Sequence, residues 1–78
     1  ERHSSLLASG IVSINGEFKK GSLVSIFGKN IKIAQGLTNY SSKEIELIKG
    51  KRSSEFEKYI KNSDYEEVIH KNNLYLLK

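Results

Sequence analysis

The sequence predicts a mainly β domain with short helices, in which a strongly curved sheet closes into a small mixed β-barrel. Three observations support this prediction. Five short apolar runs have the length of strands, turn-forming residues separate them, and one helical excursion lies between residues 41 and 61. At 78 residues the chain is expected to form a single domain, and closing the sheet removes strand edges that a small core leaves unprotected.

The chain is expected to begin with a polar segment and one short strand. Residues 1–9 are polar apart from a pair of leucines, which we expect to dock on the core. The apolar run at residues 11–14 predicts the first strand. Asn15 and Gly16 follow it and predict a tight turn, because both residue types tolerate a positive φ angle.

Two further strands are expected after this turn. Residues 23–27 predict the second strand, residues 28–30 a turn, and residues 31–37 the third strand. Apolar and polar residues alternate in the third strand. We therefore expect its isoleucines to face the core and Lys32 to point away from it.

Two helix starts of the same design follow. The spacing Ser-x-x-Glu occurs at residues 41–44 and again at residues 54–57. In this capping box the serine oxygen accepts a free backbone N–H of the first turn, and the glutamate reaches back to the serine N–H. Helices are expected over residues 42–49 and 54–61, with Gly50 as the left-handed stop of the first. The apolar side chains expected to pack on the sheet are Ile45, Ile48, Phe56, Tyr59 and Ile60.

The C-terminal residues predict the last two strands. These cover residues 68–70 and 74–77, and residues 71–73 form the turn between them.

Composition narrows the possible classes of protein. The chain has no cysteine, which excludes disulfides and thiolate metal sites, and no apolar run long enough to span a membrane. It also has no methionine, even at position 1, so we expect it to be a piece of a longer protein.

The positive charge is concentrated in the first half of the chain. Residues 1–35 carry five Lys or Arg against two Glu, a net +3 of the total +4. A basic face attracts phosphate backbones, and it equally serves as a solubilising surface. The lysines that make this excess are Lys19, Lys20, Lys29 and Lys32.

The order of these elements and the residues that join them resemble a known domain family. Residues 5–11 (Ser-Leu-Leu-Ala-Ser-Gly-Ile) and 16–21 (Gly-Glu-Phe-Lys-Lys-Gly) match the pattern of the PUA domain. Residues 33–42, with Asn-Tyr-Ser-Ser, residues 48–55, with Gly-Lys-Arg-Ser-Ser-Glu, and residues 67–74, with Val-Ile-His-Lys-Asn-Asn, resemble the C-terminal PUA domains of bacterial glutamate 5-kinases. The resemblance covers nearly the whole chain and implies a PUA-like pseudo-barrel over residues 1–78.

The resemblance also implies a larger parent enzyme. It would phosphorylate the side-chain carboxylate of L-glutamate with ATP and Mg²⁺, the first step of proline biosynthesis, in the cytoplasm and as a homo-oligomer. That chemistry would belong to an N-terminal amino-acid-kinase domain, none of whose functional residues can be placed on this chain. The chain departs from this branch at Ala8, where proline is usual.

The residues themselves suggest no catalytic, cofactor-binding or metal site. No phosphate-binding loop follows a strand, and the serines lack a recognisable base or elbow motif. His3 and His70 are far apart in sequence and have no acidic neighbour at ligand spacing. We therefore expect His70 to be a structural histidine.

Two groups of residues are candidates for binding RNA or a protein partner. The glycine step would allow close approach of a phosphate backbone, and the lysines would release its counterions. The first group is Gly10, Ile11, Lys19, Lys20, Lys29 and Lys32, and the second is Lys49, Lys51 and Arg52. Both groups can also be a solvated charged surface, and the tyrosines show no stacking pattern of the kind that single-strand binders use.

Three functions remain open at this point. The first is an accessory domain that shapes the assembly or regulation of a kinase through protein contacts, and it is the one we favour. The second is an RNA-binding module, and the third is a small free-standing protein.

Overall fold

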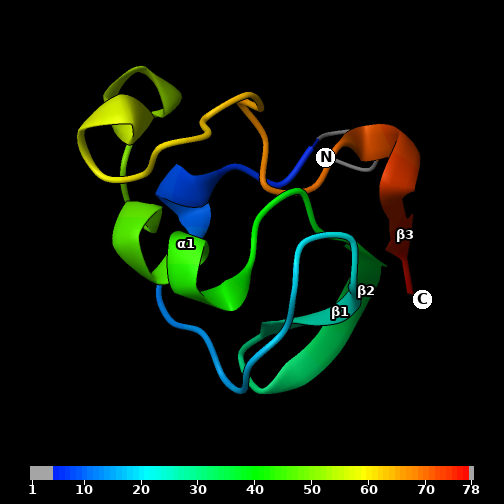
Figure 1. Ribbon diagram of the computed structural model, residues 1–78. Coiled ribbons are helices and arrows are strands. Elements are labelled where there is room, and N and C mark those ends of the chain that lie inside the picture. Colours follow the sequence, from blue (N-terminus) through cyan, green and yellow to red (C-terminus); the bar gives the residue numbers. More distant parts are fainter. Residues whose placement is uncertain (1–4, 78) are drawn as a thin grey trace.

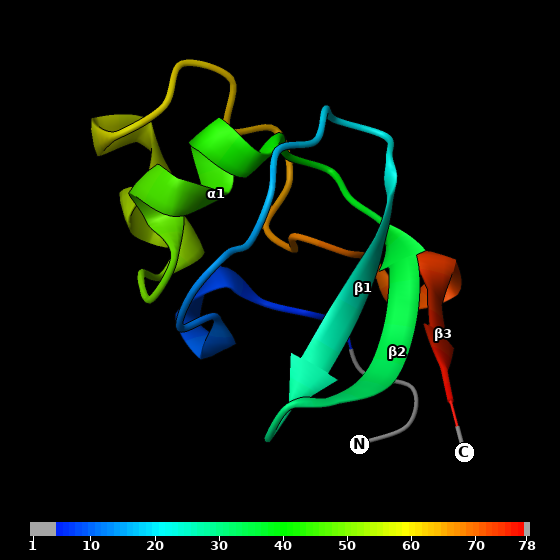
Figure 2. The same ribbon diagram turned by 90° about the horizontal axis from the view of Figure 1, so that it is seen from below.

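The computed structural model describes residues 5–77 and shows a curved antiparallel sheet with short helices packed on one side (Figures 1 and 2). The sheet has three strands in the order β1-β2-β3. The predicted class, mainly β with short helices, is therefore confirmed. The elements are the 3₁₀ helix η1 (Ala8–Gly10), β1 (Leu23–Gly28), β2 (Ile31–Leu37), α1 (Ser42–Ile48), the 3₁₀ helices η2 (Ser53–Lys58) and η3 (Lys71–Asn73), and β3 (Leu74–Leu76).

Strands β1 and β2 form a hairpin, as the sequence predicted. The two turn residues, Lys29 and Asn30, have φ angles of 54° and 69°. Positive φ at both central positions defines the type I′ turn, whose twist matches that of the flanking strands. A bulge between Ile26 and Phe27 shifts the register near the turn, and β2 then pairs with β3 through Ala34, Gln35 and Gly36.

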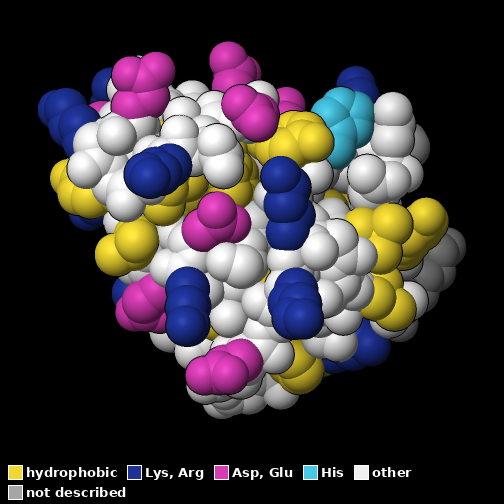
Figure 3. All heavy atoms as spheres, viewed as in Figure 1, with side chains coloured by type: hydrophobic (Ala, Val, Ile, Leu, Met, Phe, Trp, Pro, Cys, Tyr) yellow, Lys and Arg dark blue, Asp and Glu magenta, His cyan; other side chains and the backbone are white. Residues whose placement is uncertain are grey.

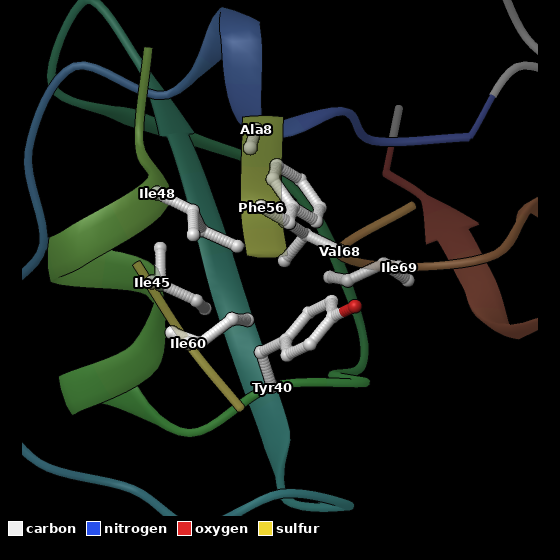
Figure 4. Close-up of a cluster of buried hydrophobic side chains, with 8 residues drawn as sticks. All are labelled: Ala8, Tyr40, Ile45, Ile48, Phe56, Ile60, Val68 and Ile69. Atoms are coloured by element: carbon white, nitrogen blue, oxygen red, sulfur yellow. The ribbon is translucent and has the colours of Figure 1, made fainter. Parts of the chain in front are cut away.

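Side chains from the helical excursion fill the core. The predicted positions Ile45 and Ile48 of α1 are buried, and Phe56 of η2 lies against them from the neighbouring helix (Figure 4). The complete cluster is Ala8, Tyr40, Ile45, Ile48, Phe56, Ile60, Val68 and Ile69. Tyr59 was expected to share this face, but its side chain is 43% exposed.

The core-facing side of β2 differs from the prediction. Ile31 and Ile33 are 66% and 45% exposed, whereas Ala34 and Gly36 are buried. The prediction was wrong because the backbone of β2 passes too close to its neighbours for large side chains. A Cβ atom on Gly36 would lie 2.6 Å from the carbonyl oxygen of Asn73. Apolar and polar residues do alternate along β2, but the small residues Ala34 and Gly36 form the face that points toward the core.

Helix α1 begins as predicted and ends at Ile48, one residue before the predicted end. The Ser41 Oγ accepts the Glu44 backbone N–H at 3.2 Å, and the Glu44 carboxylate accepts the Ser41 N–H at 2.8 Å, which completes the capping box. Gly50 follows the helix with a φ angle of 79°. Its N–H donates to the carbonyl of Ala8 at 2.6 Å and so ties the end of α1 to η1.

The second helix is not the capped α-helix that the sequence predicted. It is the 3₁₀ helix η2, in which the N–H groups of Glu55 and Tyr59 donate to carbonyls three residues earlier. Arg52 precedes it without a side-chain cap, so Ser54 does not start the helix. A segment of six residues gains little from α-helical cooperativity, and the tighter 3₁₀ form is common at this length.

Two of the five predicted strands are absent from the described part of the chain. Residues 11–14 form no ladder with any of residues 5–77, although Gly16 does have a positive φ of 82°. At residues 68–70 a single antiparallel bridge joins Ile69 to Leu6, with the Leu6 N–H donating to the Ile69 carbonyl at 2.9 Å. The bridge stays short because the chain turns into η1 two residues after Leu6.

Candidate functional site

The lysines of the first candidate group lie at two separate places. Lys19 and Lys20 precede β1, whereas Lys29 and Lys32 lie at the hairpin turn after it. The 6 residues of β1 span about 17 Å, so the two pairs lie at opposite ends of the strand. The Lys20 ammonium also lies 5.4 Å from the ring centroid of Tyr65, a cation–π contact.

The remaining members of the first group, Gly10 and Ile11, lie at the end of η1. Gly10 is exposed, and a Cβ atom added to it would meet no atom within 4 Å. Ile11 is half-buried and packs against the core. Both residues line a groove that runs beside β1, whereas none of the four lysines lines it.

This groove has a volume of about 730 Å³. Residues 10–15 form one wall and residues 23–27 of β1 form the other. Its floor includes the core side chains Ile45, Val68 and Ile69, which are at most 3% exposed. In Figure 2 the extended segment before β1 passes to the left of this strand, and β2 lies to its right. The sequence did not predict this groove. The signal for it is a strand-like run at residues 11–14 that forms no ladder within residues 5–77.

The second candidate group lies between α1 and η2. The Lys49 ammonium pairs with the Glu46 carboxylate at 2.5 Å, and the Lys51 ammonium lies 4.9 Å from the ring centroid of Tyr59. Arg52 is exposed at the start of η2. Two of the three cations therefore already have intramolecular contacts. Figure 3 shows acidic side chains interspersed with basic ones on the face of the molecule that it draws.

The most strongly constrained polar side chain is Tyr40, which follows β2. Its hydroxyl donates to the carbonyl of Tyr65 at 2.5 Å and accepts the N–H of the same residue at 3.0 Å. Burial raises the pKa of the Tyr40 phenol; the hydrogen bond from the Tyr65 backbone acts in the opposite direction, and the nearby charges of Glu44 and Asp64 add to the rise. These contacts are structural, because they hold a loop against the core.

The histidine that the structure describes also has a structural contact. The Nδ1 atom of His70 accepts the backbone N–H of Asn72 at 3.1 Å and caps η3, which confirms the expectation for this residue. His3 lies outside the described residues. Residues 5–77 contain no group of three or more His, Cys, Asp or Glu side chains that could hold a metal ion. No helix among them is long and apolar enough to cross a membrane.

Comparison with known proteins decides the family. The family model of the PUA domain matches residues 1–60 of the chain. The chain belongs to the PUA domain family. Of the described elements, the match includes β1, β2, α1 and η2, the part of this PUA domain that supplies both walls of the groove.

The most similar relatives include glutamate 5-kinases from several bacteria. The chain is 48% identical to the glutamate 5-kinase of Dictyoglomus turgidum over 97% of its own length and 21% of that protein. It is 45% identical to that of Carboxydothermus hydrogenoformans, over 94% of the chain and 20% of the relative, and 46% identical to that of Aquifex aeolicus, over 90% and 20%. This PUA domain therefore spans about a fifth of the length of the curated relatives that it matches.

Proposed function

We propose that this PUA domain is the non-catalytic accessory part of a glutamate 5-kinase, where it shapes assembly or regulation through protein contacts. The observation that supports the proposal is the extent of the similarity. The chain aligns with glutamate 5-kinases over almost all of its own length but only about a fifth of theirs. Most of such an enzyme lies outside this domain.

In this proposal the chemistry takes place in an amino-acid-kinase domain of the same polypeptide. That domain would bind ATP and Mg²⁺ and transfer the γ-phosphoryl group to the side-chain carboxylate of L-glutamate in the cytoplasm. Mg²⁺ is held by carboxylates and phosphate oxygens, and residues 5–77 offer no clustered set of such ligands. In this proposal the side chains of the PUA domain take no part in that transfer.

Contacts with the rest of the enzyme would use apolar surface that the isolated domain leaves exposed. The outer face of the sheet carries such a surface, in which Leu23 pairs with Leu37 and both side chains are exposed. Tyr75 of β3 lies beside Gln35 on the same sheet and is 53% exposed. Exposed apolar side chains gathered on adjacent strands are typical of surfaces that a partner covers.

The test is removal of residues 1–78 from the longer protein. We expect the shortened enzyme to keep glutamate-dependent ATP consumption but to change its oligomeric state, measured by light scattering, or its response to proline. An enzyme that is unchanged in both properties would refute the accessory role.

RNA binding is the second candidate, because of the +3 net charge of residues 1–35 and the PUA family itself. It predicts affinity that falls steeply with salt and with Lys19→Glu and Lys20→Glu substitutions, since each neutralised phosphate releases counterions. Amide NMR shifts of the 78-residue chain that remain flat on titration with a structured RNA hairpin at low salt would exclude it.

A further inference from the structure

Among residues 5–77, the backbone groups on the edge of β1 that faces away from β2 have no pairing strand. In the pairing with β2, the Thr38 N–H donates to the Ser22 carbonyl, and Val24 and Ile26 lie two and four residues further along the same ladder. Because ladder bonds in an antiparallel pair come at every second residue, Val24 and Ile26 point their backbone groups toward β2. The N–H and C=O groups of Leu23 and Ser25 therefore point away from the sheet.

The groove lies between β1 and the segment that precedes it, because residues 23–27 and residues 10–15 both line it. Figure 2 shows this segment on the side of β1 away from β2. The outward N–H and C=O groups of Leu23 and Ser25 therefore point toward the groove.

In the opposite wall, the backbone of residues 12–17 forms no hydrogen bond with any other residue in the range 5–77. Val12 in this wall is 87% exposed, although it is part of a strand-forming apolar run. Both walls of the groove thus offer backbone donors and acceptors, and apolar core side chains lie between them.

We propose that an extended strand from the part of the polypeptide outside these 78 residues occupies the groove and pairs with β1. An extended backbone is the occupant that satisfies hydrogen-bonding groups on a strand edge. The relatives supply a source for the strand, because about four fifths of their length lies outside the matched segment.

The inserted strand extends the sheet beyond β1 and protects an edge that invites aggregation. This inference rests on the proposed function only in requiring a longer polypeptide. The inserted strand would attach the remainder of the enzyme to the PUA domain.

Amide hydrogen exchange tests the proposal in the longer protein and in the 78-residue chain. We expect the amides of Leu23 and Ser25 to exchange at least about 100-fold more slowly in the longer protein, because they become hydrogen-bonded there. Val24 and Ile26 are internal controls, since β2 protects them in both proteins. Equal exchange of Leu23 and Ser25 in the two proteins would overturn the proposal, as would protection in the 78-residue chain that rises with its concentration, which would identify a second copy as the occupant.

A substitution in the opposite wall gives an independent test. Val12→Lys changes an exposed side chain, so the 78-residue chain should keep its melting temperature. In the longer protein the same change places a charge beside the inserted strand, and we expect the protection of Ser25 to fall at least about 10-fold. Leu47→Lys is the matched control, because Leu47 is 50% exposed and lies outside the groove. Unchanged protection in Val12→Lys would contradict the proposal.

The two proposals fail in distinguishable ways. A longer protein that protects Ser25 but does not phosphorylate glutamate would refute the kinase assignment alone. One that phosphorylates glutamate but leaves Ser25 unprotected would refute the inserted strand alone.

Discussion

The hydroxyl of Tyr40 holds both backbone groups of a single residue, Tyr65. It donates to the Tyr65 carbonyl at 2.5 Å and accepts the Tyr65 N–H at 3.0 Å. Tyr40 belongs to the segment between β2 and α1, whereas Tyr65 lies 25 residues further along the chain. The pair therefore fastens the loop that follows η2 to the centre of the domain.

Tyr40→Phe should destabilise the domain because it removes both hydrogen bonds and leaves the Tyr65 backbone groups in a partly buried place. We expect a loss of about 1–3 kcal/mol in the free energy of unfolding, measured by urea denaturation. Tyr75→Phe is the control, since Tyr75 is 53% exposed, and it should change stability by less than about 0.5 kcal/mol. Equal stability of the two variants would show that the hydroxyl contacts contribute nothing.

The same tyrosine should make stability depend on alkaline pH. Burial raises the pKa of Tyr40 in the folded state above the value of about 10 that a free tyrosine has. The folded state therefore holds this proton more tightly, so the stabilisation is complete below pH 10 and is lost as pH rises through the raised folded pKa. Lysines titrate in the same range, so the quantity to measure is the difference between the wild type and Tyr40→Phe. A difference that stays constant from pH 8 to pH 11.5 would contradict the prediction.

The two Ser-x-x-Glu sequences should contribute unequally to the free energy of unfolding. Ser41→Ala removes the N-cap of α1 and should cost about 0.5–2 kcal/mol. Ser54→Ala should cost much less, because Ser54 lies inside η2 and Arg52 precedes that helix without a side-chain cap. Thermal unfolding of both variants, monitored by circular dichroism, measures the difference. Comparable losses would mean that η2 starts at Ser54 in solution.

Two glycines offer a further matched pair. Gly36→Ala would place a Cβ atom 2.6 Å from the Asn73 carbonyl and 2.9 Å from Ile69, so we expect a loss of at least about 1–3 kcal/mol. Gly10→Ala meets no atom within 4 Å and should be neutral or slightly stabilising, because it reduces the entropy of the unfolded chain. Chemical denaturation of the two variants checks this order. Tolerance of Gly36→Ala would show that β2 lies further from residue 73 than the structure places it.

Local signals predicted the hairpin, α1 and the class of the domain. The type I′ turn depends on two residues, and the cap of α1 depends on Ser41 and Glu44, which are three positions apart. Such features follow from short-range chemistry that the sequence displays directly. The resemblance to the PUA family likewise rests on segments in which several of these short-range features occur together.

Features that depend on distant contacts were predicted poorly. Ile31 and Ile33 alternate with polar residues as buried side chains do, but the approach of residue 73 to Gly36 decides which face is inward. Residues 11–14 have the composition of a strand, but pairing needs a neighbour that residues 5–77 do not supply. The groove that results could not be seen from spacing alone, because its walls are about ten residues apart in sequence and meet only in space.

The assignment of the chemistry to the remainder of the polypeptide is tested most directly by phosphotransfer. We would incubate the longer protein and the 78-residue chain separately with ATP, Mg²⁺ and L-glutamate and measure the release of ADP that depends on glutamate. The longer protein should turn over, and the 78-residue chain should give no release above that of buffer. Glutamate-dependent ADP release by the 78-residue chain, or none by the longer protein, would contradict the account.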